Sequence, residues 1–438
     1  MIDRPIRLEQ KPSASAAPIS ARSILSQSSS TVVERFLLMG AIIMLPLENE
    51  LPTVAGMSAS FLIFGALAIY VVLNRPRALG VIWYHPVFIA AYAFIGVSVL
   101  LEFSSPLSSY QQIIRFAQMI AGAVCVAVLC RDRSALAAGL YGYVAAALWV
   151  SFLLIMNSYG VLAGMGSASD FDEASQIRGS VDVGFRDNLN RVAFVCTQGA
   201  IVAFALSLSA RLERYRIILG GIATFSLVAS FLTMSRGAFV ISLVVFPAML
   251  YTHGFRRYGK VLILAFVLGL SIYALVPDVV WTRMMFTTEM RDDGKMEGRA
   301  YVYATAFNRL PEYIVSGVGA GNFYQKWGLE KGFTRGRGVL GLHNTLLQVT
   351  VMWGVLGLSM YLWIMWCVYC SIPLRCGNDE LSLALLGLFI SLALYLLVMH
   401  VLADKVFAVA IGLLVGARQG IWPTGIVTAV DAQGEAVR

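Results

Sequence analysis

The chain has 438 residues, of which 58% are hydrophobic and 13% are charged, whereas about 25% of the residues of a typical soluble domain are charged. This composition excludes an ordinary soluble domain. It predicts an all-α polytopic membrane protein, because the apolar residues form blocks of roughly 17–25 residues that cross ~30 Å of hydrocarbon as helices. The net charge of +8 is no evidence for a nucleic-acid partner, and none is expected, since basic loops normally fix the orientation of a membrane protein.

About twelve membrane-spanning helices are expected along the chain. Residues 1–34 precede them, are rich in Ser, Ala and Pro, and are expected to form a disordered cytoplasmic tail without a secretory signal. Residues 423–438 are expected to form a second cytoplasmic tail. The expected spans are 35–49, 57–74, 84–101, 111–130, 135–158, 190–209, 215–232, 237–253, 259–277, 344–370, 381–400 and 405–418.

Two long polar segments interrupt the apolar blocks. The first covers 159–189, within the region 35–277 that holds the first nine helices. The second covers 278–342 and is expected to form a large periplasmic loop with short helices. The last three helices follow in the region 343–422.

The basic residues of the short loops predict the orientation. If the N-terminus is cytoplasmic, the short outer loops hold only Arg236 and Lys405, while the short cytoplasmic loops hold many more. Both tails are then cytoplasmic, and both long polar segments face outward, where further basic residues predict an electropositive surface. The basic residues of the short cytoplasmic loops are Arg75, Arg77, Arg131, Arg133, Arg211, Arg214, Arg216, Arg256, Arg257, Lys260 and Arg375.

His343 is the strongest candidate for acid–base chemistry. It follows the large loop directly and precedes Asn344 at the start of an apolar helix, where the partial positive charge of a helix N-terminus favours a neutral imidazole. Asn344 is placed to orient a polar group. Gly354 and Gly357, farther along the same helix, are expected to permit close helix contact. A lone histidine at a helix end is more often structural than catalytic, and both interpretations stay open here.

Two groups of basic residues are candidates for anion binding. Arg236 lies with Ser235 in a very short outer turn. Its guanidinium group there either extends to lipid headgroups or binds a phosphate through two fixed hydrogen bonds. Arg186, Asn190 and Arg191 lie at the start of the sixth expected span, where backbone N–H groups also favour an anion. Because Arg191 lies inside the helix start, it is favoured over Arg186.

The large loop contains two further features. Gly298-Arg299 opens a run rich in aromatic and small residues that predicts an amphipathic helix ending at Pro311. The sequence Gly-Val-Gly-Ala-Gly-Asn-Phe follows at 317–323, and no strand precedes it, so its glycines predict a tight turn and not a dinucleotide site.

No metal or other cofactor is expected. Asp292, Asp293 and Glu297 are interpreted as flexible surface acids. The six cysteines all lie outside the two long polar segments, which argues against a disulfide framework or a zinc site there.

These motifs together resemble the superfamily of O-antigen ligases and O-antigen or exopolysaccharide polymerases, which are bacterial membrane glycosyltransferases. The Ser-Arg-Gly turn at 235–237, the loop from Gly298 to Phe323, and the spacing from His343-Asn344 to Gly354 and Gly357 carry the resemblance. The loop and the His-Asn spacing are fairly specific motifs, while the Ser-Arg-Gly turn alone is not. The resemblance covers most of the membrane region and leaves out the N-terminal tail.

The resemblance implies a GT-C-like helical fold in the inner membrane with the active site facing the periplasm. It implies transfer of a glycan from an undecaprenyl-diphosphate-linked donor to lipid A–core or another glycan acceptor, without a metal and with inversion at the anomeric carbon. His343 is then the expected base with Asn344 beside it, and Arg191, Arg236 and Arg299 are expected to hold the diphosphate. Arg186, Asn190 and Ser235 are secondary candidates.

Two alternatives remain beside the ligase. A polymerase needs the same donor site and the same base, and only its acceptor differs. A transporter of lipid-linked glycans belongs to another class. The sequence argues against ion-coupled transport, because no Asp or Glu lies in the middle of any expected span and Arg115 is the one clear charge within them.

Overall fold

The computed structural model describes the parts of the chain that carry most of the expected helices. These are residues 30–47, 59–158, 189–209, 212–233, 235–253, 298–335, 338–339, 341–372, 380–400, 402 and 404–420.

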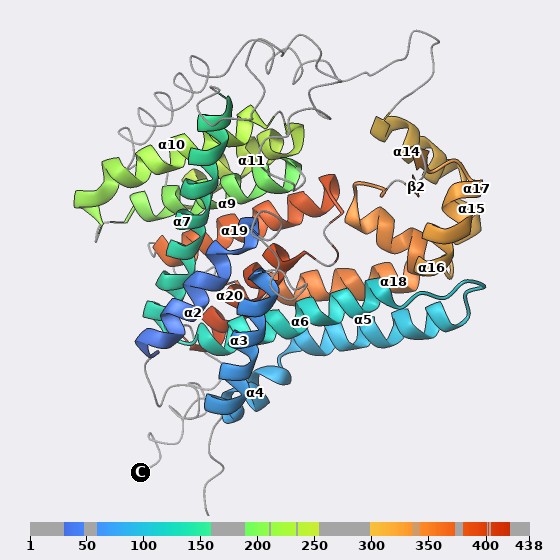
Figure 1. Ribbon diagram of the computed structural model, residues 1–438, viewed down its shortest axis with the longest axis horizontal. Helices are drawn as coiled ribbons and strands as arrows, with labels where there is room; N and C mark the ends of the chain where they lie inside the picture. The colour runs from blue at the N-terminus through green and yellow to red at the C-terminus, as the bar shows by residue number, and fades with distance from the viewer. Residues whose placement is uncertain are drawn as a thin grey trace, which may run out of the picture.

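Helices form nearly all of the described structure (Figure 1). The first half of the chain contains α2 (Val32–Ile43), η1 (Leu45–Leu47), α3 (Ala59–Asn74), α4 (Pro76–Trp83), α5 (Pro86–Phe103), α6 (Gln111–Leu129), α7 (Arg133–Ser158), α9 (Leu189–Ser207), η3 (Glu213–Tyr215), α10 (Arg216–Leu232) and α11 (Arg236–His253). The second half contains α14 (Gly298–Asn308), α15 (Leu310–Tyr313), α16 (Ala320–Asn322), the π-helical turn η5 (Phe323–Trp327), α17 (Gly328–Glu330), α18 (Thr345–Tyr369), α19 (Glu380–Val398) and α20 (Lys405–Gly420). A short antiparallel pair, β1 (Thr334–Arg335) and β2 (Gly338–Val339), lies between α17 and α18.

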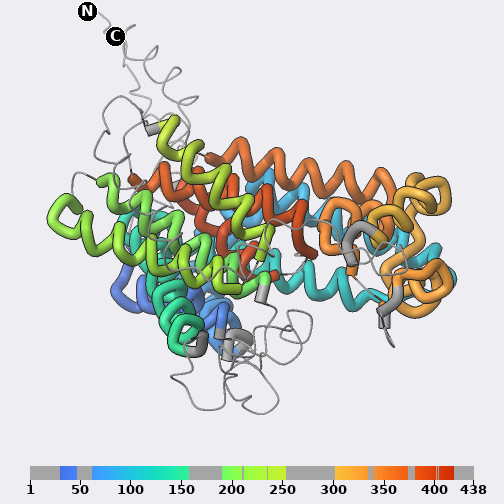
Figure 2. The backbone as a smooth tube through the Cα atoms, turned by 90° about the horizontal axis from the view of Figure 1, so that it is seen from above, coloured from blue at the N-terminus to red at the C-terminus, as the bar shows by residue number. Residues whose placement is uncertain are grey.

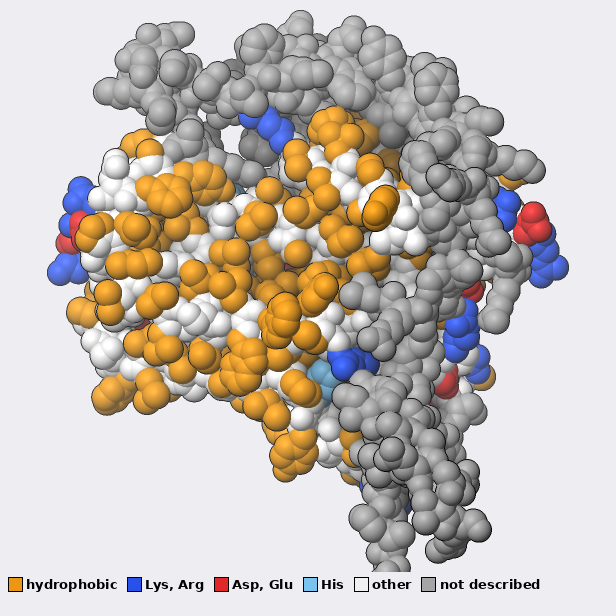
Figure 3. Space-filling model, turned by 180° about the vertical axis from the view of Figure 1, so that it is seen from behind, with side chains coloured by type: hydrophobic (Ala, Val, Ile, Leu, Met, Phe, Trp, Pro, Cys, Tyr) orange, Lys and Arg blue, Asp and Glu red, His pale blue; other side chains and the backbone are white. Residues whose placement is uncertain are grey.

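Eleven of the twelve expected spans overlap a helix of the structure, and the ninth, 259–277, lies outside the described residues. Seven described helices are long and apolar enough to cross a membrane, and α3 with α4 forms a further apolar pair bent by 104°. Figure 3 shows hydrophobic side chains over most of the described part of one face, with most charged side chains near its edges. The chain is therefore a polytopic α-helical membrane protein, and the number twelve stays a prediction.

Three long helices set the frame of the site. α5, α6 and α18 run side by side, and the short helices α14–α17 gather at one end of them, as Figures 1 and 2 both show. α7 crosses the direction of these helices (Figure 1). The short helices lie within the segment 278–342, as the sequence predicts, and the side of the membrane that this segment faces stays a prediction.

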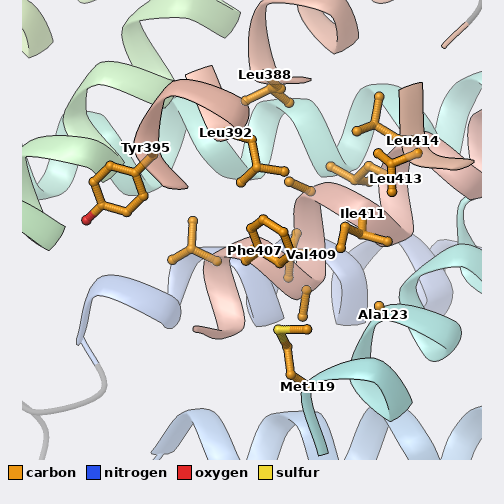
Figure 4. Packing of buried hydrophobic residues seen from close by; sticks show 14 of the residues in the cluster. Met119, Ala123, Leu388, Leu392, Tyr395, Phe407, Val409, Ile411, Leu413 and Leu414 are labelled. Atoms are coloured by element: carbon orange, nitrogen blue, oxygen red, sulfur yellow. The ribbon is translucent and has the colours of Figure 1, made fainter. Parts of the chain in front are cut away.

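α20 is the central helix of the core. Every residue from Val406 to Ala417 is buried. Its Phe407, Val409 and Ile411 lie near Met119 of α6, and Leu388 and Leu392 of α19 lie on the other side (Figure 4). A helix that is apolar all round is stable only when it is enclosed in this way, so α20 fixes the spacing of its neighbours.

The loops expected in the cytoplasm lie close to one another. Glu34 of α2 is fully buried and forms ion pairs with Arg75 (2.6 Å) and Arg131 (3.2 Å). Arg133 forms another with Glu380, at the start of α19 (2.9 Å). These contacts support the expected alternation of loops between two sides of the membrane.

α18 differs from the continuous helix that the sequence predicts. Trp353 and Gly354 have non-helical backbone angles, and Gly354 has a φ of 63°. The break lies between an N-terminal segment that follows Asn344 and a longer segment that packs along α5, where Phe94 contacts Trp353 and Tyr361 edge to face. Gly354 therefore allows a break in α18 and a close backbone approach, where close helix packing was expected.

The glycine-rich loop at 317–321 fills this break. The N–H groups of Val318 and Gly319 donate to the carbonyls of Val351 and Met352 (both 2.9 Å), and the N–H of Val355 donates to Ile314 (2.7 Å). A Cβ on Gly317 would lie 2.3 Å from the Met352 carbonyl oxygen. The expected tight turn is confirmed, and its partner is the opened backbone of α18.

Glu102, the penultimate residue of α5, anchors the same loop. The side chain is fully buried. Its carboxylate accepts hydrogen bonds from the backbone N–H groups of Ser109 (2.7 Å), Ala320 (2.7 Å) and Gly321 (2.8 Å). One buried charge thus ties the end of α5, the α5–α6 connection and the glycine-rich loop together.

The short helices α14–α17 have a small core of their own. Tyr313, Phe323, Trp327 and Phe333 pack ring against ring. Beside them, Glu312 forms ion pairs with Arg309 (3.0 Å) and with Lys331 (3.2 Å). Arg309 and Lys331 therefore contribute less unbalanced positive charge to the surface of this segment than the sequence predicts.

Replacing Gly354 with alanine will destabilise the protein. The added Cβ would lie 2.2 Å from the carbonyl oxygen of Val315, and alanine disfavours a φ of 63°. The matched control is Gly96→Ala on α5, because a Cβ there meets no atom within 4 Å and alanine favours a helix by about 1 kcal/mol. Thermal unfolding of the two variants should show a lower Tm for Gly354→Ala only. Equal Tm values would contradict the packing described here.

Candidate active site

The N-terminal ends of three helices, α9, α11 and α18, meet at the end of α19, beside the turn that leads to α20. The hydroxyl of Thr345, at the start of α18, donates to the carbonyl of Met399 (2.7 Å). The hydroxyl of Tyr395 donates to the carbonyl of Asn190, near the start of α9 (3.3 Å). A Cβ on Gly237, at the start of α11, would lie 2.9 Å from Val398. Residues that are far apart in the sequence are therefore neighbours here.

His343 lies at this meeting point in an unusual backbone conformation. Its φ is 47°, and it is the only residue other than glycine with a positive φ in the described part of the chain. Its carbonyl accepts a hydrogen bond from the hydroxyl of Tyr303, on α14 (3.3 Å). A non-glycine residue in this region costs ~1–3 kcal/mol and persists only where the surrounding structure enforces it. The backbone at His343 is thus held in place from α14 and α18.

Asn344 caps α18. Its side-chain oxygen accepts a hydrogen bond from the backbone N–H of Leu347 (2.9 Å), the usual arrangement of an asparagine N-cap. Asn344 therefore fixes the start of the helix directly after His343. A catalytic role for Asn344 stays a proposal.

A cavity of about 850 Å³ opens beside the same turn. It lies between α3, α6 and the start of α20, with contributions from α9 and η5. Its polar and apolar lining residues are Phe64, Gly65, Ala68, Gln112, Arg115, Gln118, Met119, Ala121, Gly122, Cys125, Arg191, Tyr324, His400, Asp404, Lys405 and Ala408.

Arg191 is held at the wall of this cavity by Asp404. The Nε of Arg191 lies 3.1 Å from the Oδ2 of Asp404, and both side chains are largely buried. The other carboxylate oxygen of Asp404 accepts from the backbone N–H of Val406 (2.9 Å) and so caps α20. Since a charge-assisted bond fixes the direction of a guanidinium, Asp404 positions Arg191 in the cavity wall.

His400 links the cavity to His343. It lines the cavity, and its Nδ1 is buried without a hydrogen-bond partner among the described residues. Burial and, to a smaller extent, the neighbouring His343 lower the pKa of His400 to about 4, although Asp404 opposes this shift. His400 is therefore neutral at physiological pH, and its imidazole lies close enough to His343 for their charges to interact.

Replacing His400 with glutamine will flatten the dependence of stability on pH. In the unfolded chain His400 takes up a proton as the pH falls through its usual pKa of 6.5, while in the folded protein it does so only near pH 4. The wild type should therefore lose stability as the pH falls from about 6.5 to 4.

The measurement is the Tm of wild type and variant at pH 7 and pH 5. His85, at the start of α5, has its pKa lowered to about 4 by burial and by Arg418, and it contributes equally in both proteins. The fall in Tm should be smaller in the variant. An equal fall would show that His400 is not buried in this way.

The sequence-predicted site residues lie partly together. Arg191 lines the cavity, and Arg236 begins α11 at the meeting point of the helix ends. The hydroxyl oxygen of Ser235 accepts from the backbone N–H of Ala238 (3.5 Å) and so caps α11. Arg299 is the second residue of α14, but its side chain lies outside the described residues, as does the whole of Arg186.

Several residues of the cavity are not recognisable as site residues from the sequence alone. His400, Asp404 and Lys405 come from the turn between the last two helices, and Tyr324 comes from η5. Arg115 was noted as a charge within a span without a function. Its position among glutamines on α6 was the available signal.

No group of three or more His, Cys, Asp or Glu side chains that could hold a metal ion occurs within the described parts of the chain. The acids Asp292, Asp293 and Glu297 lie outside those parts. The expectation of a site without a metal thus stays a prediction.

Residues 221–362 match the family model described as O-Antigen ligase. This match supports the resemblance to the O-antigen ligase superfamily. The matched range of this O-antigen ligase model begins within α10 and ends within α18, so it contains Arg236, the glycine-rich loop, His343 and Asn344. Arg191 and the α19–α20 turn lie outside it. No curated protein gives a significant match to the chain.

Proposed function

We propose that the protein transfers a glycan from an undecaprenyl-diphosphate-linked donor to an acceptor hydroxyl at the periplasmic face of the inner membrane, and that the acceptor is lipid A–core. The observation that carries the proposal is the position of His343. This residue lies within the O-antigen ligase match, at a meeting point of helix ends beside a cavity lined by Arg191.

The proposed reaction is a single displacement. The acceptor hydroxyl oxygen attacks the anomeric carbon of the donor sugar, and a new glycosidic bond forms as the bond to the diphosphate oxygen breaks. His343 takes the hydroxyl proton, and the electron pair of the broken bond leaves with undecaprenyl diphosphate. Attack opposite the leaving group inverts the configuration of the anomeric carbon.

The leaving diphosphate gains negative charge as the bond breaks. Arg191, Arg236 and Arg299 are proposed to stabilise that charge, because fixed cations in a partly dry site lower the barrier. Asn190, Ser235 and Arg186 are proposed as secondary contacts. Because the arginines stabilise the charge on the leaving diphosphate, the reaction needs no metal, and activity should persist in EDTA.

Deletion of the gene, followed by gel analysis of surface glycans and of carrier-linked glycans, tests the proposed function. Lipid A–core without long chains, together with long chains accumulated on the carrier, supports the ligase. Single repeat units in place of long chains would indicate a polymerase, which uses the same donor and base. Carrier-linked glycan retained on the cytoplasmic side would indicate a transporter and would contradict glycan transfer.

A further inference from the structure

The short helix α15 lies against the break in α18, a helix that is long and apolar enough to cross a membrane. The carbonyl of Ile314, directly after α15, accepts a hydrogen bond from the backbone N–H of Val355 (2.7 Å). A Cβ on Gly354 would lie 2.2 Å from the carbonyl oxygen of Val315. These two contacts hold the end of α15 against the side of a membrane-spanning helix.

The neighbouring helix α5 gives the level of this contact within the membrane. Trp353, at the break, packs its ring against Phe94, and from Phe94 to the end of α5 at Phe103 the helix rises by ~14 Å. The hydrocarbon core of a bilayer is ~30 Å thick. Leu100 and Phe103 are exposed apolar side chains, so the lipid-facing surface of α5 extends to its end. The break therefore lies at the level of the acyl chains of one leaflet.

At this level α15 has an exposed apolar face. Pro311 and Val315 are four residues apart and so lie on one side of a helical turn. Both are exposed, Val315 by 73%. On α18, Val355 and Leu356 are exposed as well. Because the backbone of Val355 is hydrogen-bonded to the residue before Val315, the exposed apolar surfaces of α15 and α18 lie side by side.

The only charge between Leu310 and Ser316 is that of Glu312, and it is balanced. Its carboxylate accepts a hydrogen bond from the Nε1 of Trp327 (3.1 Å) and forms ion pairs with Arg309 (3.0 Å) and Lys331 (3.2 Å). A charge near hydrocarbon is tolerated when it is paired. The apolar face of α15 can therefore contact lipid without exposing an unpaired charge to it.

We propose that the apolar face of α15, formed by Pro311 and Val315, inserts among the acyl chains of the leaflet at the end of α5, α6 and α18 where α14–α17 gather. The continuity of this face with the lipid-facing surface of α18 favours lipid as its occupant over a second copy of the chain. Part of a segment that the sequence predicts to be an aqueous loop is thus a membrane-inserted turn. The inference does not depend on glycan transfer.

Contact with lipid is tested with a bimane label on Val315→Cys, in the full chain with Cys370 and Cys376 replaced by serine, in nanodiscs of phosphatidylcholine and phosphatidylglycerol. Leu356→Cys is the lipid-facing control and Glu330→Cys, at an exposed position on α17, is the water-facing control. Phosphatidylcholine with a nitroxide on its acyl chain should quench the label at positions 315 and 356 equally, and much less at 330. Iodide in the buffer should quench the label at position 330 alone.

Two results of this experiment would overturn the proposal. Quenching of position 315 by iodide, as strong as that of position 330, would place the turn in water. Protection of position 315 from both quenchers, together with disulfide-linked dimers of Val315→Cys after oxidation, would show that a second copy covers this face.

A pair of charged substitutions tests the same contact without a label. Val315→Asp should lower the Tm in nanodiscs, because an isolated carboxylate is costly among acyl chains. Leu329→Asp is the matched control, since Leu329 is an exposed apolar residue on α17, and it should leave the Tm unchanged. Val315→Leu keeps the apolar surface and should also leave the Tm unchanged. Equal Tm values for Val315→Asp and Leu329→Asp would contradict insertion of α15.

Discussion

Replacing His343 with asparagine will lower the rate of glycan transfer by about 10²–10⁴-fold, the usual contribution of a general base. Asparagine is the sharpest substitution, because it tolerates the positive φ of 47° that His343 adopts and removes only the imidazole. The measurement is transfer from a carrier-linked donor to the acceptor by the purified protein.

Two measurements make this result interpretable. The Tm of His343→Asn and its KM for the donor should match those of the wild type, since His343 is not part of the cavity lining. Glycine at the same position relieves the backbone strain and should be equally inactive. Wild-type transfer by either variant would remove His343 from the chemistry.

Replacing Glu102 with alanine will cause a large loss of stability. Three buried backbone N–H groups, those of Ser109, Ala320 and Gly321, would lose their acceptor. Each unsatisfied buried donor costs about 1–3 kcal/mol. The segment that carries Tyr324 should then detach from the end of α5, and transfer should fall together with the Tm.

Glu102→Gln and Glu330→Gln are the matched variants. Glutamine keeps one acceptor oxygen but turns an amide donor toward the N–H groups, so the loss of Tm should be smaller than that of the alanine variant but clear. Glu330 is exposed on the neighbouring α17, and its replacement should change neither the Tm nor the rate of transfer. An unchanged Tm in Glu102→Ala would show that this carboxylate does not anchor the loop.

The positions of the long helices follow from the sequence, because the length of an apolar block decides whether it spans a membrane. The expected spans 84–101, 111–130 and 190–209 correspond to α5, α6 and α9. The boundaries move by one or two residues where a specific cap decides them. At His85, for example, the imidazole accepts from the N–H of Val87 (3.3 Å) and starts α5.

The break in α18 could not be predicted in the same way. The sequence from Thr345 to Tyr369 reads as one apolar helix, and a glycine in a membrane helix is equally consistent with close packing and with a break. The distinction depends on the backbone of residues 314–319, which binds the opened turn from another part of the chain.

The sequence predicts individual residues of the site but not how these residues are arranged in space. His343, Arg191 and Arg236 were identified individually, but their convergence depends on the α19–α20 turn. Asp404 is separated from its partner Arg191 by 213 positions, and no local pattern connects them. Arg115 is visible in the sequence as a charge in a span, but its place in the cavity wall is visible only in the structure.

The outward orientation of His343 is the central claim, because the donor and acceptor of the proposed reaction meet outside the cytoplasm. It is tested most directly by a cysteine at position 343, in a chain whose Cys370 and Cys376 are replaced by serine. Arg77→Cys, at an exposed position on α4 in a loop expected to be cytoplasmic, is the control. A membrane-impermeant maleimide should label position 343 in intact spheroplasts and position 77 only after permeabilisation. Labelling of position 343 from the inside alone would contradict the account.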